Sequence, residues 1–131
     1  MVERKIAMPS ILTSIKKMHG IDEMDESFDM ELIMHINGAL MIMTQLGVGP
    51  KEGFSITSKD EEWGQLLEGR KDLDLVFSDV HLRTKLVFDP PQNSFLVASI
   101  KEQIKEYDWR IEAWHTPQHE IQPEPEPEPE V

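Results

Sequence analysis

The chain has 131 residues, no cysteine and a formal net charge of −12. This length suits a single domain, and the lack of cysteine excludes disulfides and cysteine-ligated metals. The negative charge argues against binding to the DNA backbone, which needs clustered cations. Five acidic residues fall at or after Glu120, so the body carries −7, a charge that lets DNA pass without adhering.

The start of the chain predicts neither export nor membrane insertion. Glu3 and Arg4 lie close to the first residue, and no long apolar run follows them, which argues against a signal peptide. The longest uninterrupted apolar run covers residues 39–43, far short of the roughly 20 residues of a membrane span. We therefore expect a soluble protein made in the cytoplasm, with no membrane partner.

Residues 9–20 predict a short first helix. Pro9 and Ser10 suit its start and Gly20 suits its end. The apolar residues at helical spacing between them are Ile11, Leu12, Ile15 and Met18. The acidic linker over residues 21–26 lacks the alternating ligands of a calcium loop, so we interpret it as a solvated turn.

The chain is organised around a predicted helix over residues 27–47, about five turns long. Ser27 is the expected N-cap, Asp29 and Glu31 suit the positive end of the helix dipole, and Gly47 suits a left-handed end. The expected core stripe consists of Phe28, Leu32, Ile33, Ile36, Ala39, Leu40, Met43 and Leu46.

A second apolar ridge on this helix, here called the methionine ridge, consists of Met30, Met34 and Met41. A helix with two apolar sides needs two coverings. The second covering is either another helix of the same chain or another subunit, because exposed contiguous apolar surface is typical of interfaces and methionine adapts well to them. The methionine ridge is our hypothetical subunit interface.

Residues 48–59 predict a long loop, long enough to be functional. The candidate partner-contact residues in it are Val48, Lys51, Phe54 and Ile56. Phe54 and Ile56 alternate with polar neighbours, a weak indication of a short strand. A short helix with Trp63, Leu66 and Leu67 follows, with Ser58 and Glu61 at capping-box spacing before it and Gly69 after it.

Two longer helices are predicted next. The third main helix runs from a cap at Asp72 to Phe88 and stops at the Asp-Pro-Pro sequence of residues 89–91. One face of it groups Leu73, Val76, Phe77, Val80, Val87 and Phe88, and an adjacent face groups Leu75, Leu82 and Leu86. Asn93 or Ser94 caps the fourth main helix, and Glu106 and Arg110 form an exposed pair on it. Its expected buried face contains Leu96, Ile100, Ile104, Tyr107, Ile111 and Trp114.

The sequence changes character after residue 115. Residues 123–130 alternate strictly between proline and glutamate, and we call residues 123–131 the Pro-Glu segment. Proline stiffness and charge repulsion favour an extended, disordered segment of about 28 Å. It serves either as a solubilising tail or as an arm that docks on a basic groove of a partner. We predict an all-α fold: a small bundle of four main helices, a short helix and a long central loop over residues 1–115, and an acidic Pro-Glu tail over residues 116–131.

The sequence contains no catalytic constellation. Phosphate-binding loops, serine elbows, zinc-protease pairs and cysteine nucleophiles are all missing. His35 and His81 lie on predicted helices and can approach each other, but two histidines without a third spaced ligand are a weak metal signal. The three tryptophans do not alternate with basic residues, which argues against base stacking. We assign no catalytic, cofactor or metal residues and predict a protein that is not an enzyme.

The body of the chain resembles the head-tail connector proteins of long-tailed bacteriophages, also called head completion or neck adaptor proteins. The stretches that carry the resemblance are ILTSIKKMHGI, SFDMELIMHINGALMIMTQLGVGP, LVFDPP and FLVASIKEQIKEYDWRIE, within residues 11–112. The resemblance implies a virion protein at the head-tail junction that forms a ring under the portal protein and follows its twelvefold symmetry. Such a ring extends the DNA channel, lets DNA through without specific binding, and docks the next neck or tail-completion protein. The Pro-Glu segment departs from this family pattern.

Two hypotheses from different classes follow. The first is a structural phage neck adaptor made in the bacterial host cytoplasm. The second is an acidic module that imitates DNA and inhibits a nucleic-acid enzyme, which requires carboxylates spaced like phosphates on an ordered surface. Because much of the excess charge lies in the tail and the linker, the sequence favours the first.

Overall fold

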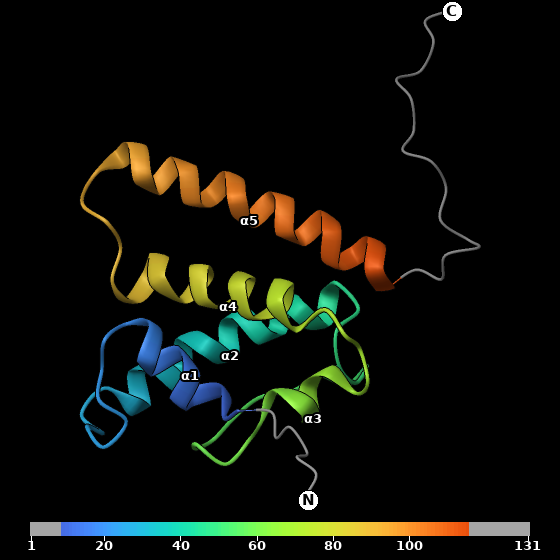
Figure 1. The fold of residues 1–131 in the computed structure, drawn as a ribbon, viewed down its shortest axis with the longest axis horizontal. Coiled ribbons are helices and arrows are strands. Elements are labelled where there is room, and N and C mark those ends of the chain that lie inside the picture. The colour runs from blue at the N-terminus through green and yellow to red at the C-terminus, as the bar shows by residue number, and fades with distance from the viewer. Residues whose placement is uncertain (1–8, 116–131) are drawn as a thin grey trace, which may run out of the picture.

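A computed structural model describes residues 9–115, which form an all-α bundle (Figure 1). The helices are α1 (Ile11–Met18), α2 (Asp29–Gln45), α3 (Trp63–Leu67), α4 (Leu73–Phe88) and α5 (Ser94–His115). Residues 9–115 contain no strand, only an isolated bridge between Ser10 and Glu62. The predicted fold class is confirmed. The predicted tail over residues 116–131 lies outside the described residues.

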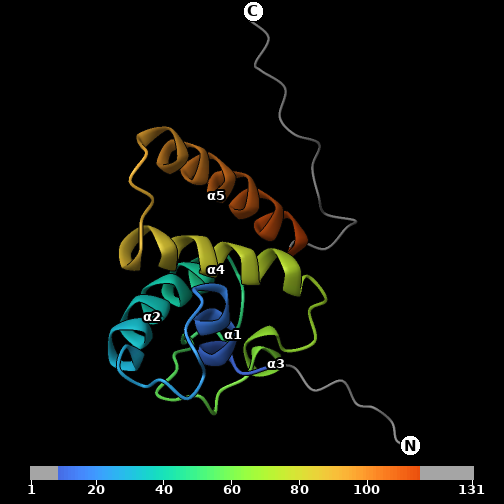
Figure 2. The same cartoon turned by 60° about the vertical axis from the view of Figure 1, so that its left-hand side comes forward.

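The fold has α4 at its centre, between α2 on one side and α5 on the other (Figures 1 and 2). Both neighbours run antiparallel to α4, and α1 packs on α2. Fully buried apolar residues come mainly from α1, α2, α3 and the first half of α4. The outer helix α5 contributes only Ile104 and Ile111 to the buried set. The α5 side of the bundle is therefore the more thinly packed one.

The caps of α1 and the end of α2 follow the prediction. Thr13 N donates to Ser10 Oγ at 3.1 Å, which satisfies one free amide of the first turn of α1. Gly47 adopts a left-handed φ of 95° after α2. Val48 N then donates to Met43 O at 2.9 Å, the closing hydrogen bond of a Schellman motif. These bonds fix where each helix begins or ends.

The predicted cap at Ser27 is wrong. The helix begins at Asp29, and Phe28 occupies the N-cap position without a side-chain cap. Ser27 instead donates its backbone N–H to Asp25 Oδ1 at 3.0 Å, within a local turn. Phe28, expected in the core stripe, is partly exposed and contacts Phe88 edge to face, with ring centroids 5.7 Å apart.

The predicted strand at Phe54 and Ile56 is also wrong. Asn37 of α2 takes the place of a partner strand, because its side chain pairs with both backbone groups of Ile56. Asn37 Oδ1 accepts from Ile56 N at 2.7 Å, and Asn37 Nδ2 donates to Ile56 O at 2.9 Å. The loop is thus fastened to α2 by one amide side chain while Ile56 enters the core.

The starts of α3 and α4 differ from the predicted caps. The capping box of α3 is formed by Glu62 and Gln65, while Glu61 binds the amides of Thr57 and Ser58 in the preceding loop. Asp72 does precede α4, but its carboxylate makes no cap bond.

Arg70 holds the Asp72 carboxylate instead and links three parts of the fold. It donates to Asp72 Oδ1 at 2.8 Å, to Gly47 O at 3.3 Å and to Ile111 O at 3.0 Å. One guanidinium therefore joins the end of α2, the start of α4 and the second half of α5.

Asn93 caps α5 as predicted, since its Oδ1 accepts from Phe95 N at 2.7 Å. The exposed pair on this helix is also confirmed, with 2.8 Å between Arg110 Nε and Glu106 Oε2. The predicted burial of α4 and α5 is too extensive, because neither helix is covered along its whole length. The predicted core residues that are exposed are Val87, Leu96 and Trp114.

Candidate interaction surface

The methionine ridge is exposed along one side of α2. The exposed fractions are 83% for Met30, 61% for Met34 and 62% for Met41. No helix among residues 9–115 covers them, so the alternative of a covering within this part of the chain is wrong. The core stripe on the opposite side is buried at Leu32, Ile36, Ala39, Leu40 and Met43. Of the two apolar sides of α2, the core stripe is thus buried and the methionine ridge is exposed.

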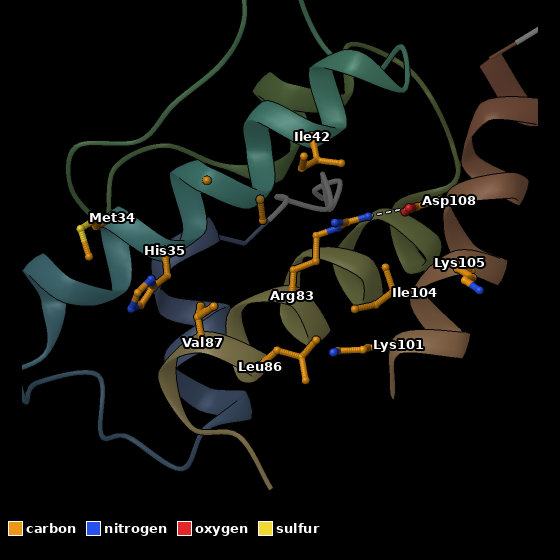
Figure 3. Close-up of a pocket in the computed structure, with 12 residues that line it drawn as sticks. Met34, His35, Ile42, Arg83, Leu86, Val87, Lys101, Ile104, Lys105 and Asp108 are labelled. Atoms are coloured by element: carbon orange, nitrogen blue, oxygen red, sulfur yellow. Dashed lines mark hydrogen bonds and ion pairs between the residues drawn. The ribbon is translucent and has the colours of Figure 1, made fainter. Parts of the chain in front are cut away.

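A groove of about 610 Å³ lies beside the ridge, between α2, α4 and α5 (Figure 3). Met34 belongs to both the ridge and the groove. The other apolar side chains of the groove come from all three helices: Ala39, Ile42, Leu86, Val87 and Ile104. Arg83, Lys101 and Lys105 bring positive charge to it, and Asp108 brings one negative charge. The groove therefore combines apolar walls with cations in a chain that is acidic overall.

Arg83 binds a carboxylate on each side of the α4–α5 contact. Its Nε lies 2.6 Å from Asp79 Oδ1, and its second amino group lies 2.5 Å from Asp108 Oδ2 (Figure 3). Burial, aided by a hydrogen bond with the Asp108 carboxyl, raises the pKa of Asp79 to about 8 even though Arg83 opposes the rise. The remaining oxygens, Asp79 Oδ2 and Asp108 Oδ1, are buried without a donor. A proton on Asp79 provides a donor between the two carboxyls, and the Arg83 guanidinium balances the negative charge that remains.

The histidine that lies against the His81 ring is His19, at the C-cap of α1, a pair that the sequence interpretation did not consider. Their ring centroids are 5.1 Å apart, edge to face. Burial, with smaller contributions from His19 and Lys85, lowers the pKa of His81 to about 4. His35 lies near Glu31, 3.6 Å away on the same helix. Among the described residues, no three histidine or carboxylate side chains group as metal ligands do.

The candidate contact loop is divided between core and surface. Val48 and Ile56 are fully buried, which leaves them unable to meet a partner without unfolding of the loop. Lys51 is exposed and Phe54 is partly exposed. A partner on this loop would therefore contact Lys51 and Phe54, while Val48 and Ile56 hold the loop in place.

The sequence interpretation missed the groove and the apolar surface of α5. The exposed large apolar side chains of that helix are Phe95, Leu96, Trp109 and Trp114. Lys101 and Lys105 are four residues apart, a spacing that places both on one helix face and that predicts a small basic patch. Which helix lies opposite this patch depends on the packing of α5 on α4, and no local pattern specifies it.

The described residues thus form a small helical subunit with an uncovered apolar ridge and a groove beside it, features typical of proteins that act by contact with other chains. The chain belongs to the phage connector protein family, whose model matches residues 11–118. No curated protein and no solved structure matches the chain significantly.

The family match confirms the resemblance to head-tail connectors and assigns the chain a structural role in the phage virion. The family is structural rather than enzymatic, which agrees with the prediction that the chain is not an enzyme. No helix in the described part of the chain is long and apolar enough to cross a membrane.

Proposed function

We propose that this chain forms a ring under the portal protein at the phage neck. Such a ring, dodecameric on the portal, extends the DNA channel and offers a docking surface to the tail or to the next neck protein. DNA passes through it without specific binding. Membership of the phage connector family supports the location, and the exposed methionine ridge supports self-association.

The observation that carries the proposal is the second apolar side of α2. Exposed apolar surface is costly in a monomer, and a contiguous patch is typical of an interface. Met30, Met34 and Met41 follow the helix axis, so they form a strip along which a neighbouring subunit can pack. The net charge of −12 suits a channel wall that repels the DNA backbone.

Replacing Met34 by Asp tests the ridge. A carboxylate at the centre of an apolar contact loses its hydration on assembly, so Met34→Asp should block ring formation while the monomer stays helical. Circular dichroism checks the fold, and mass photometry on purified portal rings counts the bound subunits.

Met24→Asp is the matched control, because Met24 is 80% exposed but lies in the acidic linker, outside the ridge. It should bind portal rings as the parent chain does. If Met34→Asp also assembles normally, the ridge is not the subunit interface.

Electron microscopy of phage lysates tests the location. A stop codon early in this gene should give separate tails and heads that lose DNA, and a plasmid copy should restore intact particles. Intact infectious particles without the protein would contradict the neck function.

A further inference from the structure

We propose that the groove between α2, α4 and α5 is the docking site of the chain's own Pro-Glu segment. In this arrangement residues 116–122 turn back along α5 and residues 123–131 lie in the groove. The inference rests on the charge of the groove, the chemistry of the segment and the length of the connecting chain. It does not depend on the proposed neck function.

Two of the three cations of the groove, Lys101 and Lys105, are available to a ligand. Within residues 9–115, Lys105 pairs only with Glu102, at 3.3 Å, and both side chains are 74% exposed, so the pair is weak. Lys101 forms no salt bridge among the described residues, and its ammonium points from α5 toward Leu86 of α4 (Figure 3). Arg83 is occupied by Asp79 and Asp108. The two lysines therefore provide the positive charge that an acidic segment requires.

The Pro-Glu segment matches both components of the groove. A polyproline II helix has about three residues per turn, so every third residue lies on the same face. In a strict two-residue alternation, each such face carries prolines and glutamates in turn. The prolines suit the walls formed by Met34, Ile42 and Leu86, and the glutamates suit Lys101 and Lys105. A stiff extended segment also loses little conformational entropy on binding.

The connection is long enough for docking within one chain. Lys105 lies about 15 Å and Lys101 about 21 Å along α5 from its last residue, at the rise of an α-helix. Residues 116–122 span up to about 23 Å when extended. The segment is thus tethered beside the groove at an effective concentration of order millimolar, which makes a site with only two lysines sufficient.

The absence of cysteine allows a direct test with a single nitroxide spin label. The full chain with Pro127→Cys, labelled at that cysteine, should lose amide NMR intensity at Gly38, Lys101 and Lys105. Reduction of the nitroxide should restore the signals. Replacing Lys101 and Lys105 together by Glu should abolish the loss. Replacing Lys17 and Lys59 by Glu, two exposed lysines outside the groove, should leave it unchanged.

Two outcomes would overturn the proposal. The first is equal broadening of amides over the whole surface, which indicates a segment without a docking site. The second comes from a mixture of two chains, one isotope-labelled without nitroxide and one spin-labelled without isotope. Broadening at the groove in this mixture would show that the groove binds the Pro-Glu segment of a neighbouring copy. Neither outcome decides whether a ring forms under the portal, which is measured by counting the subunits bound to portal rings.

Discussion

Gly49 and Gly38 differ in what an added methyl group would meet. Gly49 has a φ of 88°, and a Cβ there would lie 3.0 Å from Leu66 Cδ1 and 3.3 Å from Leu66 O. Gly38 lies inside α2, where a Cβ would meet no atom within 4 Å. We therefore expect Gly49→Ala to lower the free energy of unfolding by about 1–3 kcal/mol. Gly38→Ala should raise it by about 0.5–1 kcal/mol through helix propensity.

Urea unfolding followed by circular dichroism measures both changes. If both alanine variants changed the free energy of unfolding by the same amount, the turn at Gly49 would be able to move away from Leu66 without loss of stability. At this scale the sequence predicts Gly47 at the end of α2, but the close approach of Gly49 to Leu66 appears only in the fold.

The contact between helices α4 and α5 contains a buried carboxyl, Asp79, whose pKa is raised. Because the pKa of Asp79 is raised to about 8, the folded chain binds more protons than the unfolded chain between about pH 4 and pH 8. Asp79 therefore lowers the free energy of unfolding as the pH rises through that range. Asp79→Asn keeps a neutral group there and removes the effect.

The Asp79→Asn variant should thus be close to the parent chain in stability at pH 5 and gain on it toward pH 8. The gain is at most about 1.4 kcal/mol per pH unit, the value of one fully released proton. Urea unfolding of both proteins at several pH values measures the difference. Glu106→Gln, in the exposed pair with Arg110, serves as the control with little change. Parallel pH profiles for Asp79→Asn and the parent would show that Asp79 is ionised in the fold.

Helix periodicity predicted the helices well. Their exact ends and the loops around them depend on side-chain hydrogen bonds between residues far apart in the sequence. The apolar stripe of α2 and the breakers at Gly47 and residues 89–91 are local signals, and the helices follow them. Asn37 binding Ile56 and Arg70 binding Ile111 join residues 19 and 41 positions apart. No spacing rule covers such pairs, so the strand at residues 54–56 was mispredicted, and Asp72 stands at the predicted N-cap position with its carboxylate bound to Arg70.

In the candidate interaction surface too, features of a single helix could be predicted and features that need several helices could not. The methionine ridge could be predicted because it is a property of one helix. The groove beside it could not, because it needs α2, α4 and α5 together. In the predicted contact loop Val48 and Ile56 are buried, since an apolar residue in a loop is equally suited to fastening that loop to the core.

Across the whole molecule, the two proposals share one residue. Met34 lies in the ridge, where a neighbouring subunit would pack, and in the groove, where the Pro-Glu segment would dock. A docked segment therefore covers part of the subunit interface in the isolated chain. We expect a chain with Glu124, Glu126, Glu128 and Glu130 replaced by Gln to release the segment and to self-associate at lower concentration than the parent.

The charge change alone also reduces repulsion between copies, so the control must match it. Replacing Asp22 and Asp25 by Asn, and Glu23 and Glu26 by Gln, takes the net charge from −12 to −8, as the tail variant does. These four residues are exposed in the linker, away from the groove. Sedimentation velocity over a concentration series should show association of the tail variant at concentrations where the linker variant is still monomeric. Association of both at one concentration would assign the effect to net charge, and the Pro-Glu segment would then have no part in keeping the subunits apart.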